Sequence, residues 1–121
     1  MSYDLGFFSP REGLTLEDVR TAYRQACEGE LSSEGEDDAT LAQFAAALES
    51  RYPQLSALRD DQIDDSPWSC DFDFGARHLI VSMSFSKAEE VGAYILQLLN
   101  THALVLYDPQ SDQAFLGDRA L

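Results

Sequence analysis

The hydrophobic pattern of the chain changes at Cys70, and this change constrains the fold more than any other feature. Phe72 and Phe74 alternate with aspartates, and this period of two residues indicates a strand. Residues 75–77 (GAR) then predict a tight turn, and residues 78–85 (HLIVSMSF) predict a second strand. The side chains on one face of that strand would be Leu79, Val81, Met83 and Phe85. A β-hairpin over residues 72–85 requires an antiparallel sheet.

Three other segments carry apolar residues at helical spacing. The first ends near residues 27–29, the second ends at Pro53, and the third carries an apolar stripe from Val91 to His102. Each segment starts with a capping-box pattern, in which a Ser or Thr is followed three residues later by an acidic residue or Gln. The predicted pairs are Thr15 with Asp18, Thr40 with Gln43, and Ser86 with Glu89.

Three further strands complete the predicted elements. Residues 3–8 (YDLGFF) predict a central strand, residues 104–107 (LVLY) another, and residues 114–116 a short last one. The order is then strand, helix, helix, strand, strand, helix, strand, followed by the short last strand. We predict a single α+β domain over residues 1–121, with an antiparallel sheet and helices packed on one face. Leaving out the second helix gives βαββαβ, so we expect a ferredoxin-like (split βαβ) arrangement with an extra helix.

The charge of the chain limits its partners. There are 22 acidic and 8 basic residues, which gives a formal net charge of −14. Such a chain repels nucleic acid and anionic lipid, and its basic residues are scattered, so we expect neither nucleic acid nor membrane as a partner. A basic protein, a polyamine or a metal ion is the natural alternative. A simpler interpretation is that the acidity only keeps the protein soluble.

The cysteines and the first residues bear on localisation. Cys27 and Cys70 form no C-x-x-C pair, so we expect two reduced, partly buried thiols. Residues 1–13 have no basic stretch followed by a long apolar run, as a signal peptide would, and no apolar stretch reaches the length of a membrane span. We therefore predict a cytoplasmic protein, either a monomer or a weak homodimer.

No catalytic pattern is found in the sequence. The D-F-G triplet at residues 73–75 lacks the other kinase motifs, so we interpret it as a strand that ends at a glycine turn. His78 and His102 stand in no zinc pattern, and G-x-S-x-G, the P-loop and G-x-G-x-x-G are missing. We predict no catalytic residues, no cofactor and no metal. Because acids are so numerous, a small enzyme with a carboxylate-lined cleft remains an alternative.

The acidic residues concentrate in one part of the sequence. Between Glu28 and Asp73 lie thirteen acids and only two arginines, which accounts for −11 of the −14. Two acidic stretches flank the second helix and could border one surface, beside Tyr52 and Trp68. Aromatic residues inside an acidic rim are typical of a protein-binding surface. The alternative for Trp68 is that it closes the edge of the core. The candidate partner-binding residues are Asp60, Asp61, Asp64, Asp65, Trp68, Glu34, Glu36, Asp37 and Asp38.

Four sequence runs resemble a group of small acidic bacterial proteins. The runs are M-S-Y-D-L at the start, S-P-W-S at 66–69, S-M-S-F-S-K-A-E-E at 82–90 and A-L-V-L-Y-D-P-Q at 103–110. Several members of this group resemble immunity proteins encoded beside polymorphic toxins. The resemblance implies a non-enzymatic immunity protein that neutralises a cognate basic toxin domain, for example a nuclease. It implies no catalytic residues.

Overall fold

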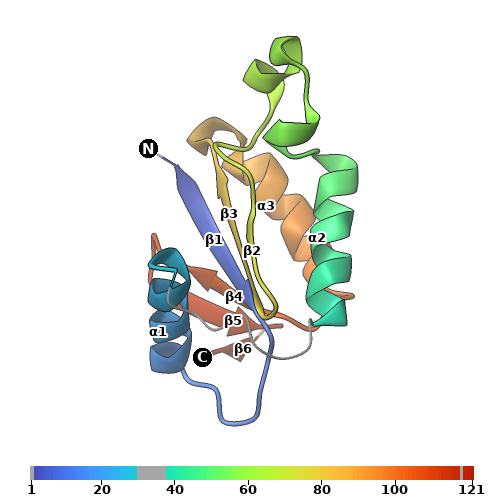
Figure 1. Cartoon of the computed structure of the whole chain (residues 1–121). Coiled ribbons are helices and arrows are strands. Elements are labelled where there is room, and N and C mark those ends of the chain that lie inside the picture. Colours follow the sequence, from blue (N-terminus) through green and yellow to red (C-terminus); the bar gives the residue numbers. More distant parts are fainter. Residues whose placement is uncertain (1, 30–37, 118) are drawn as a thin grey trace.

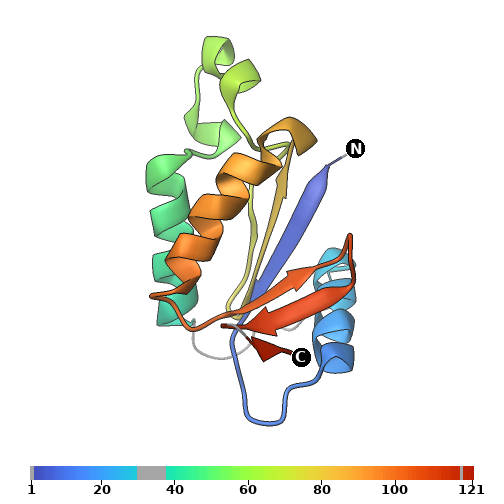
Figure 2. The same ribbon diagram turned by 180° about the vertical axis from the view of Figure 1, so that it is seen from behind.

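The computed structural model describes residues 2–29, 38–117 and 119–121. Within them the chain forms a six-stranded antiparallel sheet in the order β2-β3-β1-β4-β5-β6, with helices on both faces (Figures 1 and 2). The strands are β1 (Tyr3–Phe8), β2 (Asp73–Phe74), β3 (His78–Met83), β4 (Val105–Asp108), β5 (Gln113–Leu116) and β6 (Arg119–Ala120). The helices are α1 (Leu16–Cys27), α2 (Ala39–Arg51), α3 (Phe85–Leu99) and the 3₁₀-helices η1 (Leu55–Ala57) and η2 (Asp60–Asp65). The predicted α+β class is confirmed.

Strand β1 lies near the middle of the sheet, as predicted, between β3 and β4. Phe7 pairs with Leu79 of β3 and Leu106 of β4. Phe7 and Phe8 are both buried, although neighbouring residues of a strand point to opposite faces. Both faces of β1 must therefore be covered.

Two separate hydrophobic clusters cover these faces. Helices α2 and α3 pack on one face, where Phe44 and Val91 meet Phe7. Helix α1 packs on the other face, where Val19 meets Phe8 and Tyr107. The prediction that all helices lie on one face is wrong, because β1 and β4 carry apolar residues at consecutive positions and so need cover on both sides.

The strands β1 to β4 are arranged in the order β2-β3-β1-β4, with α2 and α3 on one face. Along the chain these elements follow βαββαβ when α1, rather than the second helix, is left out. The extra helix is thus the first one, which covers the second face. The finer likeness to a ferredoxin-like fold stays a prediction.

The predicted capping box of α1 is confirmed, and the other two are wrong. Thr15 Oγ1 accepts from the amide of Asp18 at 3.2 Å, and the amide of Thr15 donates to Asp18 Oδ2 at 3.1 Å. Helix α2 is capped by Asp38, whose Oδ1 accepts from the amides of Thr40 and Leu41. Helix α3 starts two residues earlier than predicted, after Ser84.

Contacts from a distant segment explain where β3 ends. Trp68 forms an isolated bridge with Met83, and the amide of Ser84 donates to the carbonyl of Pro67 at 2.8 Å. The chain therefore leaves the sheet at Met83, and Phe85 becomes the first residue of α3. Its predicted place on the buried strand face is wrong: Phe85 is 50% exposed and meets the ring of Tyr3 edge-on.

Two further observations concern the predicted localisation. Cys27 and Cys70 are free, but both are exposed rather than partly buried as predicted. Among the residues that the structure describes, none of the helices has the length and apolar character needed to span a bilayer.

Candidate partner-binding surface

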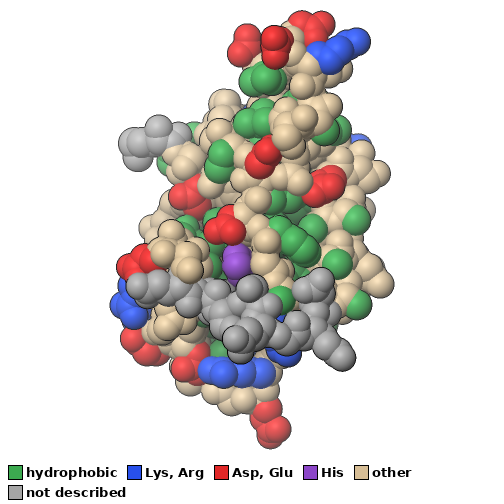
Figure 3. Space-filling view, viewed as in Figure 1, with side chains coloured by type: hydrophobic (Ala, Val, Ile, Leu, Met, Phe, Trp, Pro, Cys, Tyr) green, Lys and Arg blue, Asp and Glu red, His purple; other side chains and the backbone are tan. Residues whose placement is uncertain are grey.

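The segment after α2 leaves the body of the molecule and forms its upper end in Figure 1. We call residues 59–65 the acidic tip. Neither η1 nor η2 contains a buried residue, and all residues of the acidic tip are exposed. The tip holds Asp60, Asp61, Asp64 and Asp65, and Figure 3 shows carboxylates gathered there. Its single cation, Arg59, lies 3.5 Å from Asp61, and such an exposed pair contributes little. The carboxylates thus remain available to a partner.

Trp68 lies at the base of this segment and does not contribute to its surface. The side chain is only 4% exposed, and its indole N–H donates to the carbonyl of Tyr52 at 2.7 Å. Its ring meets those of Tyr52 and Phe72 edge-on, with centroids 6.2 and 4.9 Å away. The prediction that Trp68 contacts a partner is therefore corrected, since its whole surface is used in closing the edge of the core.

Hydrogen bonds join the two ends of the segment that carries the acidic tip. Gln54, which follows α2, accepts from the amide of Phe72 at 2.6 Å. Asp71 accepts from the amide of Ser56 at 3.1 Å. These bonds join the outgoing and returning chain below the acidic tip. The tip is consequently presented on a fixed base.

Of the exposed apolar side chains, one lies on the acidic tip and another lies near the base of the segment that carries it. Ile63 is 40% exposed within η2. Phe85 stands next to Ser84, which is hydrogen-bonded to Pro67, two residues beyond η2. Sequence reasoning missed Phe85 as a surface residue because it assigned the residue to a buried strand. The available signal was Ser84, which is as good an N-cap residue type as Ser86.

Asp38 does not belong to this surface. Its carboxylate accepts from Ser9 Oγ at 2.5 Å and from two amides of α2, and these bonds, that of Ser9 foremost, hold its pKa below the usual value. It also stands at the opposite end of α2, which at 13 residues is about 20 Å long. The predicted union of both acidic stretches on one surface is wrong for Asp38. The candidates Glu34, Glu36 and Asp37 lie outside the described residues.

The view in Figure 3 also shows acidic side chains away from the tip, spread over the rest of that face. The negative charge is therefore not confined to one zone. What distinguishes the acidic tip is that its carboxylates stand on a segment with no buried residue, which also carries the exposed Ile63.

The D-F-G triplet has a structural explanation. Asp73 and Phe74 form β2, and the amide of Gly75 donates to the carbonyl of His78 at 2.9 Å. A Cβ atom on Gly75 would lie 2.4 Å from the imidazole of His78, so a larger residue there would have to displace this ring. The interpretation as a strand ending at a glycine turn is confirmed.

Three of the described carboxylates have clearly shifted pKa values. The pKa shifts that are resolved, those of Asp18, Asp38 and Asp112, are all downward and arise foremost from hydrogen bonds. A catalytic acid would need the opposite shift. No group of three or more His, Cys, Asp or Glu residues in the described ranges is placed to hold a metal ion.

The Y-D-P-Q run at residues 107–110 contributes to the pairing of the sheet. Continuing the β1–β4 register places Pro109, which has no amide proton, opposite Asp4. The side-chain amide of Gln110 takes over the pairing: its Oε1 accepts from the Asp4 amide at 2.7 Å, and its Nε2 donates to the Asp4 carbonyl at 2.8 Å. This run therefore extends the pairing between β1 and the chain after β4.

The chain was compared with known proteins. No protein-family model, no curated protein and no solved structure matches it. The resemblance to immunity-type proteins accordingly stays a prediction.

Proposed function

We propose that this chain is a non-enzymatic, immunity-type protein that acts in the bacterial cytoplasm. It binds and neutralises a basic toxin domain, for example a nuclease, through the acidic tip together with Ile63 and Phe85. The observation that supports the proposal is the combination of four exposed carboxylates and two exposed apolar side chains on and beside a segment whose base is fixed by Trp68.

The two kinds of side chain would act on different steps of binding. Carboxylates in the rim attract a cationic partner and raise the association rate, and added salt screens this effect over about 10 Å at 0.1 M. Apolar side chains that become buried in the complex supply most of the affinity and slow dissociation. Ile63 lies within the acidic tip, and Phe85 follows Ser84, whose amide donates to the carbonyl of Pro67 at the base of the tip.

The experiment uses the product of the gene adjacent to the gene for this chain, which the proposal expects to be a toxin. Its isolated domain is mixed with the wild-type chain, and association is followed by stopped-flow fluorescence at low and high salt. D64K/D65K is compared with E12K/E28K, since both change the net charge from −14 to −10. Glu12 and Glu28 are exposed residues before and after α1. We expect D64K/D65K to slow association at low salt by about tenfold, and the control pair to change it much less.

A second pair of variants tests the apolar contacts. F85S should raise the dissociation rate, whereas L96S should not, although Leu96 is more exposed at 59% and also lies on α3. Equal effects of the two charge pairs would mean that only total charge matters, as expected if acidity serves solubility alone. Absence of binding to the neighbouring product, together with failure to protect cells that produce it, would refute the immunity role.

A further inference from the structure

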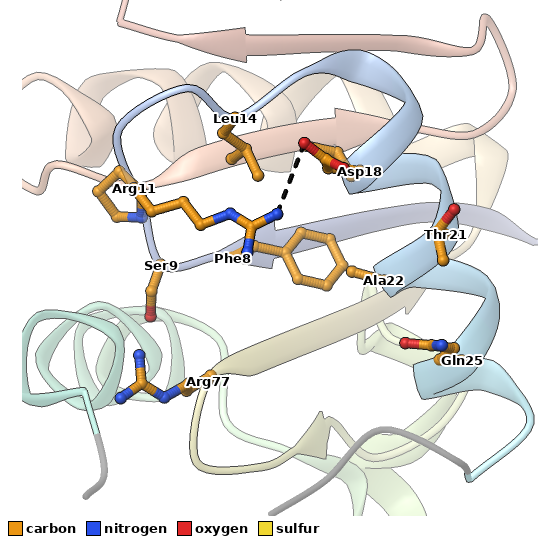
Figure 4. A pocket seen from close by; sticks show the side chains of 11 residues that line it. Phe8, Ser9, Arg11, Leu14, Asp18, Thr21, Ala22, Gln25 and Arg77 are labelled. Carbon is orange, nitrogen blue, oxygen red and sulfur yellow. Dashed lines mark ion pairs between the residues drawn. The ribbon is translucent and has the colours of Figure 1, made fainter. Parts of the chain in front are cut away.

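A cavity lies away from the acidic tip, between α1, the end of β1 and the turn after β2 (Figure 4). Its volume is about 390 Å³, which falls in the range of small-molecule sites. Phe8 and Val19 form its buried floor, and Leu14 and Ala22 line it as half-buried residues. This floor suits a compact apolar group.

Two of the eight basic residues of this acidic chain line the same cavity. Arg11 extends across Phe8 toward Asp18 in Figure 4, and Arg77 points toward Ser9 from the turn between β2 and β3. Two guanidinium groups on one small cavity are the donors that best match a carboxylate.

Neither arginine is held strongly by the described residues. The Arg11 guanidinium lies 3.5 Å from Asp18, and the two side chains are 67% and 40% exposed, so this ion pair is weak. The carboxylate of Asp18 also accepts a hydrogen bond from the amide of Thr15. No described carboxylate lies within ion-pair distance of Arg77, and the oxygens of Asp38 already accept three hydrogen bonds. Both guanidinium groups thus have donors left for a ligand.

Polar side chains complete the wall. Thr21 and Gln25 project from the same face of α1 toward the cavity, and neither side chain forms a hydrogen bond with another described residue. The cavity thus combines an apolar floor, two cations and two uncommitted polar groups.

We propose that this cavity binds a small carboxylic acid with a compact apolar body. The body rests on Phe8 and Ala22, and the carboxylate lies between Arg11 and Arg77. The site is separate from the acidic tip, so this proposal can be tested independently of the proposed toxin binding. The net charge of −14 repels anions at long range, so the affinity is weak and depends on contacts inside the cavity.

The test is an amide NMR titration of the full chain with three probes. Phenylacetate carries both the apolar body and the charge, phenylacetamide carries the body alone, and acetate carries the charge alone. We expect phenylacetate to shift the amide signals of Ser9, Thr21 and Ala22 saturably. The two other probes should bind at least about tenfold more weakly, because each lacks one of the two contacts.

Variants separate the two arginines from general charge. R11Q and R77Q should each weaken phenylacetate binding by about tenfold, whereas R24Q, an exposed arginine on α1 outside the cavity, should leave it unchanged. Three results would each overturn the proposal: no saturable shift with phenylacetate, equal binding of phenylacetamide, or a loss in R24Q equal to that in R11Q and R77Q.

Discussion

At the scale of single residues, Trp68 connects three parts of the molecule that are distant in sequence. Its indole N–H bonds to the carbonyl of Tyr52 at the end of α2, its backbone bridges Met83 at the end of β3, and its ring packs on Phe72. The acidic tip begins and ends beside these contacts. A change at Trp68 should therefore affect both the stability of the domain and the base of the tip.

We expect Trp68→Ala to lower the free energy of unfolding by about 3–5 kcal/mol, because it removes a large buried side chain. Trp68→Phe keeps most of the packing but leaves the Tyr52 carbonyl without its donor, so its cost should be about 1–3 kcal/mol. Urea unfolding measures both values. In the wild type, the fluorescence of this single tryptophan should be blue-shifted and poorly quenched by acrylamide. Strong quenching would place Trp68 at the surface and contradict this description.

At the scale of elements, the starts of helices depend on which of several capping residues the fold selects. Asp38 and Thr40 are both suitable N-cap types, two residues apart. Asp38 is selected because Ser9, at the end of β1, donates to it, and because its amide donates to the carbonyl of Ala76. Both contacts come from segments far away in sequence.

We expect Asp38→Ala to destabilise the domain by about 1–2 kcal/mol at pH 7, because the first turn of α2 loses its acceptor. Thr40→Ala is the matched control and should change stability by less than about 0.5 kcal/mol. Thermal unfolding of both variants checks the assignment. A larger loss of stability in Thr40→Ala than in Asp38→Ala would mean that Thr40, and not Asp38, caps α2.

The same residue predicts a pH dependence. The pKa of Asp38 is lowered in the folded protein, foremost by the hydrogen bond from Ser9, relative to an unfolded value of about 3.9. Its contribution is therefore fully present above about pH 4 and is lost as the pH falls through the folded pKa. Asp38→Asn keeps an acceptor but removes this titration, so its stability should fall less steeply below about pH 4 than that of the wild type.

The sequence predicted those elements whose signals are local. The YDLGFF strand, the Thr15–Asp18 capping box and the glycine turn at Gly75 depend on neighbouring residues and are found in the structure. The end of β3 and the start of α3 depend on Pro67 and Trp68, which lie outside any local window. For the same reason Phe85, which local alternation assigned to the core, could not be identified as a surface residue.

At the scale of the whole molecule, two groups of described acids play different parts. Asp18 accepts a hydrogen bond in the cap of its own helix, and Asp38 and Asp112 accept hydrogen bonds from other elements; Asp112, for example, accepts from Arg20 of α1 at 2.6 Å and from Tyr107 of β4 at 2.8 Å. The aspartates of the acidic tip make no such contact with distant elements among the described residues. Sequence composition gives both groups the same charge and could not separate them, because the division depends on which donors the fold places nearby.

This division predicts opposite effects on stability for similar changes in charge. The quadruple variant D60N/D61N/D64N/D65N removes four negative charges that repel one another and the rest of a chain at −14, so Tm should stay within about 2 °C or rise. The triple variant D18N/D38N/D112N removes three charges that receive charge-assisted hydrogen bonds, so Tm should fall by at least about 5 °C. Asn tolerates the positive φ of 54° at position 112, so only the charge is changed there. Thermal unfolding at low salt measures both Tm values. If the Tm of the quadruple variant falls as much as that of the triple variant, the tip aspartates hold the fold together and are not free for a partner.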